Sequence, residues 1–357
     1  MNGRDRPKAV IDSVTKHVTS LQDSEYISRF HNILVTTVSM RHRILSILLC
    51  CTTTLALAGD APGFHDIAQS FTNFYDAKKD KPEAEQLASF QKDVASLFPQ
   101  FYGVARYRGQ ATQADKDKFI LDAIKSFPGI RNDYVRKTRE FEINLPRYVA
   151  SFKTWFPDFQ PRFDTWVLHS LGEMDGGTRT FGGKNYLIFG IDGMVRYHGK
   201  GNESAFFHHE LFHTYHNMAL TDCDSDDEPI WNSLWQEGLA TYVSKVMNPG
   251  ANDTELLLSF PNEMAERTRK VLPAAFTDLA SVLERRDPKV YSNLFSTSDS
   301  ASTLPTRRGY YLGYLVAQDA ARSYSVQELA KLDCQTAHAL VVATVEKLRN
   351  AHPMPSR

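Results

Sequence analysis

The stretch SAFFHHELFHTYHN, Ser204 to Asn217, places four histidines and one glutamate within fourteen residues. Inside it, residues 209 to 213 have the pattern HExxH. Residues four apart lie on one face of a helix, so His209 and His213 can present both imidazoles to one metal ion. Glu210 lies about 100° round the same helix, beside the ion rather than in line with it. The alternative is an ordinary buried helix whose histidines are hydrogen-bonded within the core.

A third candidate ligand follows in LWQEGLATYVS, residues 234 to 244, where Glu237 stands twenty-four residues after His213 on a second amphipathic pattern. Catalytic zinc takes three protein ligands and keeps one open position, and two histidines plus this glutamate supply that set. Zinc held in this way lowers the pKa of its bound water to about 7 and polarises a carbonyl oxygen, while Glu210 acts as general base. The pattern therefore predicts one Zn²⁺ per chain, bound by His209, His213 and Glu237.

Together, HExxH and a following helix with W-x-E-G-x-A, residues 235 to 240, resemble the gluzincin zinc peptidases, including the aminopeptidase N-like branch. With its helical front, its short β section and the later GYYLGY, the chain from about residue 60 to 350 resembles an uncharacterised bacterial family of predicted zinc-dependent proteases. The resemblance implies that His209, His213 and Glu237 are the zinc ligands. It also implies that Glu210 is the general base of peptide-bond hydrolysis.

A donor for the oxyanion of the tetrahedral intermediate is expected in RRGYYLGY, residues 307 to 314, because gluzincins commonly place a tyrosine, histidine or arginine there. Tyr310 is the first candidate and Tyr314 the second, since four residues apart they share a helix face. Both could equally be core aromatics. Arg307 and Arg308 could instead bind a carboxylate of the substrate.

The substrate of a gluzincin usually pairs with a strand edge beside the HExxH helix, and NYLIFGI, residues 185 to 191, stands in the matching place. The alternative is that this strand is part of the core. Glycine pairs at 176–177 and 182–183 would allow close approach of a chain. The G-x-M-E-N segment with which aminopeptidase N-like enzymes fix a free amine is missing, and residues 173 to 175 are a poor substitute. An endopeptidase or a specialised peptidase is therefore favoured.

Other metal readings fit less well. The metzincin pattern requires glycine at 216 and histidine at 219, and the chain has His216 and Ala219. His216 could orient a metal ligand through a hydrogen bond, but a packed or solvated histidine is the favoured interpretation. His208 points to the opposite flank and is expected to be structural. The acidic loop TDCDSDDEP, residues 221 to 229, could bind calcium but lacks the ordered ligand positions of an EF-hand, so solvated charge is favoured.

The sequence predicts a secretory signal peptide near the amino terminus. MRHRILSILLCCTTTLALAGDA, which starts at Met40, has the basic, apolar and small-residue regions of a signal peptide, with cleavage expected after Ala58. A membrane anchor is the alternative, but the apolar run is shorter than the ~20 residues that span a bilayer. Residues 1–39 are then an upstream extension of an exported, periplasmic or secreted protein. Cys223 and Cys334 remain in the mature chain, either as a disulfide or as two thiols.

The whole chain of 357 residues has 41 basic and 42 acidic side chains, so no strong field favours nucleic acid or an anionic membrane. We predict an α+β, mostly helical fold, in which a helical subdomain (59–160) precedes a zincin-like catalytic domain (161–350) that starts with a small sheet. Asp192-Gly193, between two apolar runs, predicts a hairpin turn.

The expected partner is a peptide or protein substrate, with no membrane span after signal cleavage; the oligomeric state is not predicted. Two rivals share the site: a zinc hydrolase of a non-peptide amide or ester, and a zinc-binding protein without turnover. Glu210 argues against the latter, because a binding site needs no base.

Overall fold

The computed structural model describes residues 62–354 except residues 108, 110, 200, 220–222, 224–227 and 298–301. The expected upstream extension (1–39) and signal peptide (40–58) lie outside the described residues, as does most of the acidic loop 221–229. Within the part that is described, no helix has both the length and the apolar character needed to cross a membrane.

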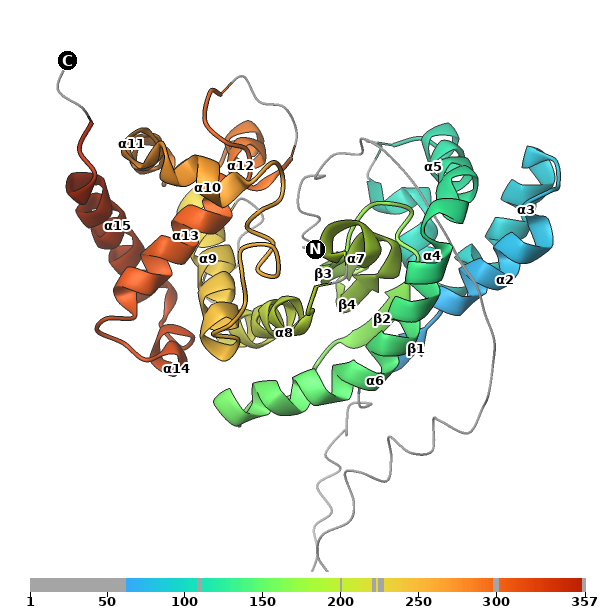
Figure 1. The fold of residues 1–357 in the computed structure, drawn as a ribbon, viewed down its shortest axis with the longest axis horizontal. Helices are drawn as coiled ribbons and strands as arrows, with labels where there is room; N and C mark the ends of the chain where they lie inside the picture. Colours follow the sequence, from blue (N-terminus) through green and yellow to red (C-terminus); the bar gives the residue numbers. More distant parts are fainter. Residues whose placement is uncertain are drawn as a thin grey trace, which may run out of the picture.

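Helices dominate the described residues and one four-stranded sheet interrupts them there, which confirms the α+β, mostly helical class (Figure 1). The strands are β1 (Phe64–Asp66), β2 (Asp164–Leu168), β3 (Gly176–Phe181) and β4 (Lys184–Gly190). The helices of the sheet-containing half are α2 (Ala68–Lys78), α3 (Glu83–Asp93), α4 (Pro99–Tyr102), α5 (Gln113–Ser126), α6 (Arg131–Trp155) and α7 (Ile191–His198). The remaining helices are α8 (Ser204–Ala219), α9 (Ile230–Met247), α10 (Met264–Arg269), α11 (Leu272–Val282), α12 (Pro288–Phe295), α13 (Arg308–Ala320), α14 (Val326–Leu329) and α15 (Cys334–Ala351).

The sheet has the order β1-β2-β4-β3, with β3 antiparallel to β4 and the other pairs parallel. Gly182 and Gly183 join β3 to β4 with φ of 59° and 80°, the positive values that a two-residue hairpin turn of this hand requires. The prediction that residues 185 to 191 form the free edge is wrong. Strand β4 is paired on both sides and buried from Tyr186 onward, which agrees with its continuous run of apolar residues. Next to it, β3 is an edge strand of the described sheet.

Asp192 and Gly193 do not form the predicted hairpin turn, because they open helix α7. The Asp192 carboxylate accepts hydrogen bonds from the backbone N–H of Ser170 at 2.6 Å and of Gly172 at 2.7 Å. A Cβ on Gly193 would lie 2.1 Å from the carbonyl oxygen of Met174. These tertiary contacts with the segment that leads into β3 decide the conformation, and the local turn signal does not.

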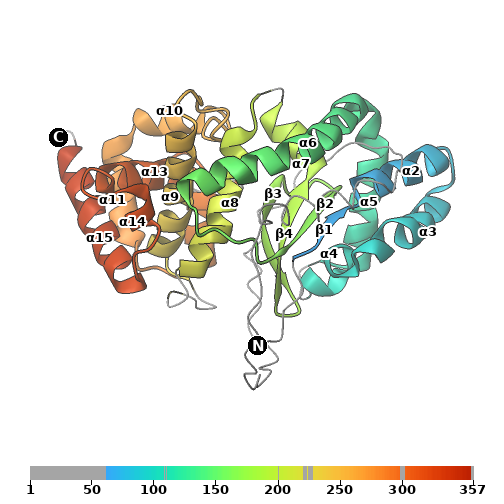
Figure 2. The ribbon, with the colours of Figure 1, turned by 90° about the horizontal axis from the view of Figure 1, so that it is seen from below.

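The predicted helical subdomain (59–160) also contains a strand. Strand β1 lies at the sheet edge opposite β3 and pairs with β2, which follows about a hundred residues later. The helices α2 to α5 share one aromatic core with the sheet, in which Phe71 and Phe90 pack with Leu168 and Ile188. Helix α6 runs across the sheet-containing half towards α8 (Figure 2). The amino-terminal helices therefore pack against the sheet and share its core.

Helix α8 lies between the sheet and the carboxyl-terminal helices, with β3 on one side and α9 on the other (Figure 1). Helices α9 and α13 cross in backbone contact, because a Cβ on Gly238 would lie 2.2 Å from the carbonyl carbon of Gly313. A buried core of α9, α11, α13 and α15, with Trp235 at its centre, holds this crossing in place. The residue after Glu237 is thus fixed by its neighbour helix.

Cys223 and Cys334 form a disulfide bond, the pairing that the sequence left open. Their Cα atoms are 5.3 Å apart and 111 residues apart in sequence. Cys223 belongs to the connection between α8 and α9, and Cys334 opens α15. The bond therefore fastens the connection between the two helices that carry the HExxH motif and Glu237.

Candidate metal centre

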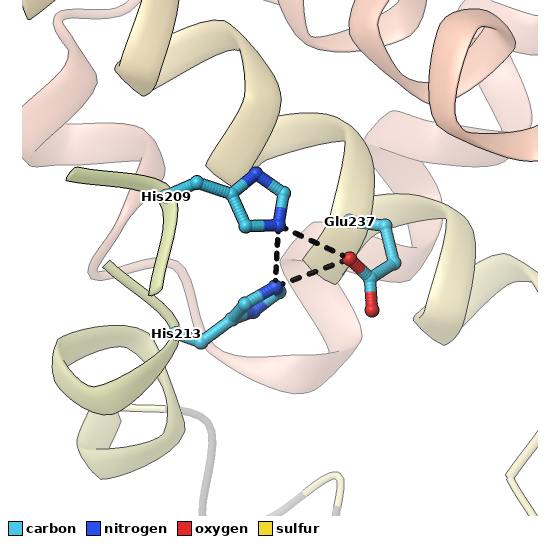
Figure 3. Close-up of side chains that lie close together, drawn as sticks. All are labelled: His209, His213 and Glu237. Atoms are coloured by element: carbon cyan, nitrogen blue, oxygen red, sulfur yellow. Dashed lines mark hydrogen bonds and ion pairs between the residues drawn. The ribbon is translucent and has the colours of Figure 1, made fainter. Parts of the chain in front are cut away.

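Three side chains converge where α8 and α9 face one another. His209 and His213 project from the same face of α8, and Glu237 projects from α9 towards both rings (Figure 3). The Nε2 atoms of the histidines are 2.9 Å apart, and the Glu237 Oε2 atom lies 3.4 Å from His209 Nε2 and 3.1 Å from His213 Nε2. Only 15%, 11% and 4% of the side chains of His209, His213 and Glu237 is exposed, so the centre is accessible but largely dry.

The three atoms are spaced as ligands of one ion would be. In a tetrahedral zinc site with bonds of 2.0–2.1 Å, donor atoms stand roughly 3.3 Å apart, and the observed separations run from 2.9 to 3.4 Å. Two imidazoles and one carboxylate are also a usual donor set of catalytic zinc. Among the described residues, these three form a cluster that could hold a metal ion.

Thr241 on α9 contacts two of the three candidate ligands. Its hydroxyl donates a hydrogen bond to the Glu237 carbonyl oxygen at 2.8 Å and lies 3.5 Å from His209 Nδ1. With Nε2 directed at an ion, the Nδ1–H group of His209 can donate to this hydroxyl, which fixes the tautomer. Sequence reasoning missed Thr241, although its position one helical turn after Glu237 could have indicated it.

The Glu210 side chain, on α8, is buried beside the cluster and lies next to the first residues of β3. A Cβ built on Gly177 would lie 3.9 Å from Glu210 Oε2, so the backbone of β3 passes the carboxylate closely. Burial raises the pKa of Glu210 above its ordinary value, the charges of His209 and His213 oppose this, and Asp175 raises it further. A raised pKa suits a group that must accept and release a proton near neutral pH.

A chain of buried charges anchors the start of β3; we call Lys137, Glu203, His198 and Asp175 the buried charge network. The Lys137 ammonium pairs with Glu203. His198 lies between two carboxylates, with Nδ1 3.3 Å from Glu203 Oε1 and Nε2 3.0 Å from Asp175 Oδ2. Burial opposes protonation of His198, but its hydrogen bonds to both carboxylates raise its pKa. The network thus links α6 and α7 to β3, and nothing in the sequence spacing pointed to it.

The two remaining histidines of the HExxH stretch are packed residues. The Nδ1 atom of His208 accepts a hydrogen bond from the Asn248 side chain at 2.9 Å, and burial lowers the His208 pKa to about 4. His216 is fully buried with its ring 5.0 Å from that of Phe212, and burial lowers its pKa to about 3. Neither ring nitrogen of His216 has a hydrogen-bond partner among the described residues.

The two tyrosine candidates, Tyr310 and Tyr314, lie on α13. The Tyr310 ring packs edge-on against Phe295 and beneath the Arg307 guanidinium. The Tyr314 hydroxyl accepts a hydrogen bond from Gln318 at 3.1 Å, and its ring lies 5.9 Å from that of Tyr242. Burial, with the neighbouring tyrosines, raises the pKa of Tyr314, which keeps its phenol protonated. Their assignment as oxyanion donors stays a prediction.

No protein-family model, curated protein or solved structure matches this chain. The site is therefore defined by its own geometry. It is a buried centre of two histidines and one glutamate, with a separate buried carboxylate beside it and a free strand edge passing that carboxylate.

Proposed function

We propose that the protein is an exported, zinc-dependent peptidase of the gluzincin type. The observation that carries the proposal is the convergence of the His209 Nε2, His213 Nε2 and Glu237 Oε2 atoms beside the buried Glu210 carboxylate. A site built only to bind a metal has no use for that fourth group. The donor set favours zinc over magnesium or calcium, which take oxygen ligands.

Zinc bound to the three ligands would lower the pKa of a coordinated water and polarise the carbonyl of the scissile bond. Glu210 is too far round the helix to be a ligand, and from there it accepts the proton of the attacking water. The same carboxyl group then delivers that proton to the leaving amine. Thr241 holds His209 in the tautomer that directs Nε2 at the ion.

The substrate is proposed to bind as an extended chain along β3. This strand is a free edge of the sheet, and its first residues pass Glu210. Unpaired backbone groups at such an edge can pair with those of a peptide and set the scissile carbonyl beside the metal. The sequence placed this role on residues 185 to 191, and the structure favours Gly176–Phe181 for it.

Tyr310, followed by Tyr314, is proposed to donate a hydrogen bond to the oxyanion. The phenol of a donor must be protonated, as the raised pKa of Tyr314 ensures for that residue. Removal of one such donor typically costs about 10²–10³-fold in kcat. The variants Tyr310→Phe and Tyr314→Phe would identify the donor by which of them loses kcat with little change in KM.

The test of the function is Glu210→Gln. Glutamine keeps the size of the side chain but removes the carboxylate that accepts the proton, while the metal ligands stay. Cleavage of a proteome-derived peptide library by the zinc-loaded protein should fall at least ~10³-fold, with zinc content unchanged. Glu83→Gln, the same change at an exposed position, is the control. A Glu210→Gln protein that cleaves within tenfold of the parent would end the assignment, and a zinc-loaded parent without turnover would end the proposed function.

A further inference from the structure

Two adjacent arginines at the start of α13 have different surroundings. Arg308 is fully buried and committed to the fold, since its guanidinium pairs with Asp278 and donates to Asn293 and to the Pro305 carbonyl oxygen. The Arg307 side chain is only partly buried, and among the described residues it has no hydrogen-bond or ion-pair partner. The sequence could not separate these two residues, and the structure leaves Arg307 as the one that can bind a ligand.

Aromatic rings hold the Arg307 guanidinium in place without neutralising it. The guanidinium carbon lies 4.4 Å from the centre of the Tyr310 ring and 5.6 Å from that of Phe260. Phe260 in turn packs on Tyr197 of α7, with ring centres 4.8 Å apart. Stacked rings orient a planar guanidinium and leave its N–H edges available for a carboxylate, which it can bind through two hydrogen bonds.

The backbone of Arg307 adopts a conformation that is unusual for a side-chain-bearing residue. Its φ is 59° and its ψ 7°, in the left-handed region, at the residue before the first turn of α13. Such a conformation costs free energy and persists only where surrounding structure imposes it, as at ligand-binding positions. Here it directs the side chain to the Tyr310 and Phe260 rings rather than along the helix.

The charges near Arg307 include the Asp175 carboxylate, but among the described residues no carboxylate forms a direct ion pair with it. The buried charge network alternates two cations with two anions, so it adds no net charge once His198 is protonated. Asp175, the last member of the network, lies close enough to Arg307 for that cation to help lower the Asp175 pKa, and it stands two residues before Gly177, whose backbone passes Glu210. A negatively charged substrate group would therefore be attracted to Arg307.

Arg307 lies on the chain just before the helix that crosses α9 beside Glu237. Helix α13 touches α9 at Gly313 and Gly238, directly after Glu237. Arg307 precedes Gly313 by six residues, which is about 9 Å along a helix.

We propose that Arg307 is the specificity-determining residue of the substrate site and binds a carboxylate of the peptide. This inference rests on the proposed peptidase function. The carboxylate can be the free carboxyl terminus of the peptide or the side chain of an aspartate or glutamate, because a guanidinium binds both by the same pair of hydrogen bonds.

Two matched comparisons distinguish these sources. In the first, a mixed peptide library with free carboxyl termini is compared with the same library amidated. In the second, amidated peptides that contain glutamate are compared with those that contain glutamine. The zinc-loaded parent should cleave the acidic member of one pair with a kcat/KM about 10- to 100-fold higher, the range of a charge-assisted bidentate hydrogen bond. Arg307→Gln should reduce this ratio to about one, and Arg307→Lys should restore part of it.

The controls separate recognition from folding. Arg267→Gln removes the same charge from an exposed position and should leave the ratio intact. Arg179→Gln tests a different arginine, which lies near Gly177; if it abolishes the ratio and Arg307→Gln does not, the proposal is wrong. It is also wrong if the parent shows no preference, or if Arg307→Gln slows both members equally.

Binding to the zinc-loaded Glu210→Gln protein provides a readout without turnover. The probes are fluorescent acetyl-Ala-Phe-Leu-Ala as acid and as amide, and acetyl-Ala-Phe-Glu-Ala-amide with its glutamine counterpart. Preferential binding of an acidic probe that Arg307→Gln removes would support the carboxylate site even if the parent cleaves nothing, which would refute the peptidase function alone. Equal binding, or no binding, of the members of both pairs would overturn the role of Arg307.

Discussion

Gly238→Ala probes the crossing that sets the position of Glu237. A Cβ at residue 238 would lie 2.2 Å from the carbonyl carbon of Gly313 and 2.4 Å from both its Cα and its oxygen. Ordinary contact begins at 3.4 Å, so the two helices must separate locally by 3.4 − 2.2 = 1.2 Å. The obstructing atoms are backbone and cannot rotate away, and α13 is also packed against α11, α12 and α15.

The expected loss follows from two opposed effects. Overpacking typically costs about 1–3 kcal/mol, and a backbone clash should fall at the upper end. In a helix interior, alanine is favoured over glycine by about 1 kcal/mol in helix propensity, which offsets part of this loss. The net free energy of unfolding should fall by about 2 kcal/mol. Because metal–ligand distances tolerate only about 0.2 Å, a shift of Glu237 by even part of the 1.2 Å should weaken zinc binding at least ~10-fold.

Urea unfolding and zinc titration of the parent and of Gly238→Ala would test this. Gly129→Ala is the matched control, since a Cβ there meets nothing within 4 Å and the residue is exposed. It should leave both measurements unchanged or raise stability slightly. Should Gly238→Ala unfold at the same or a higher urea concentration than the parent, with zinc affinity retained, the backbone contact of α9 and α13 would be refuted.

Three further predictions concern the ligand, a buried histidine and the disulfide. Glu237→Ala removes one of three ligands, so the variant should lose its zinc on dialysis, as measured by metal analysis; a full zinc complement would exclude Glu237 as a ligand. Burial lowers the pKa of His208 in the folded protein to about 4, against 6.5 for an ordinary histidine, so its stabilising contribution is complete above pH 6.5 and is lost as the pH falls towards 4. Between pH 7 and pH 5 this loss is about 2 kcal/mol, and urea unfolding of His208→Gln should show a pH dependence smaller by that amount; an unchanged dependence would contradict the buried neutral ring. Cys334→Ser opens a link between residues 111 apart and should lower the free energy of unfolding by about 2–4 kcal/mol, as reduction of the parent also should. Equal stability of oxidised and reduced parent would mean that the bond adds nothing.

The candidate metal centre could be predicted largely from the sequence. Helical spacing alone places His209 and His213 on one face and Glu210 beside them, because an isolated helix already fixes those directions. The fold class was equally predictable from hydrophobic periodicity. These features depend on residues within about four positions of one another.

The tertiary structure decided what depends on contacts between distant residues. It made β3 rather than β4 the free edge, turned Asp192 and Gly193 into the start of a helix, and paired Cys223 with Cys334. It also buried Arg308 and left Arg307 available at the next position, a difference that two adjacent arginines cannot show in sequence. Local spacing determines which side chains share a face, whereas strand order, burial and charge pairing are set by the free energy of packing the whole chain.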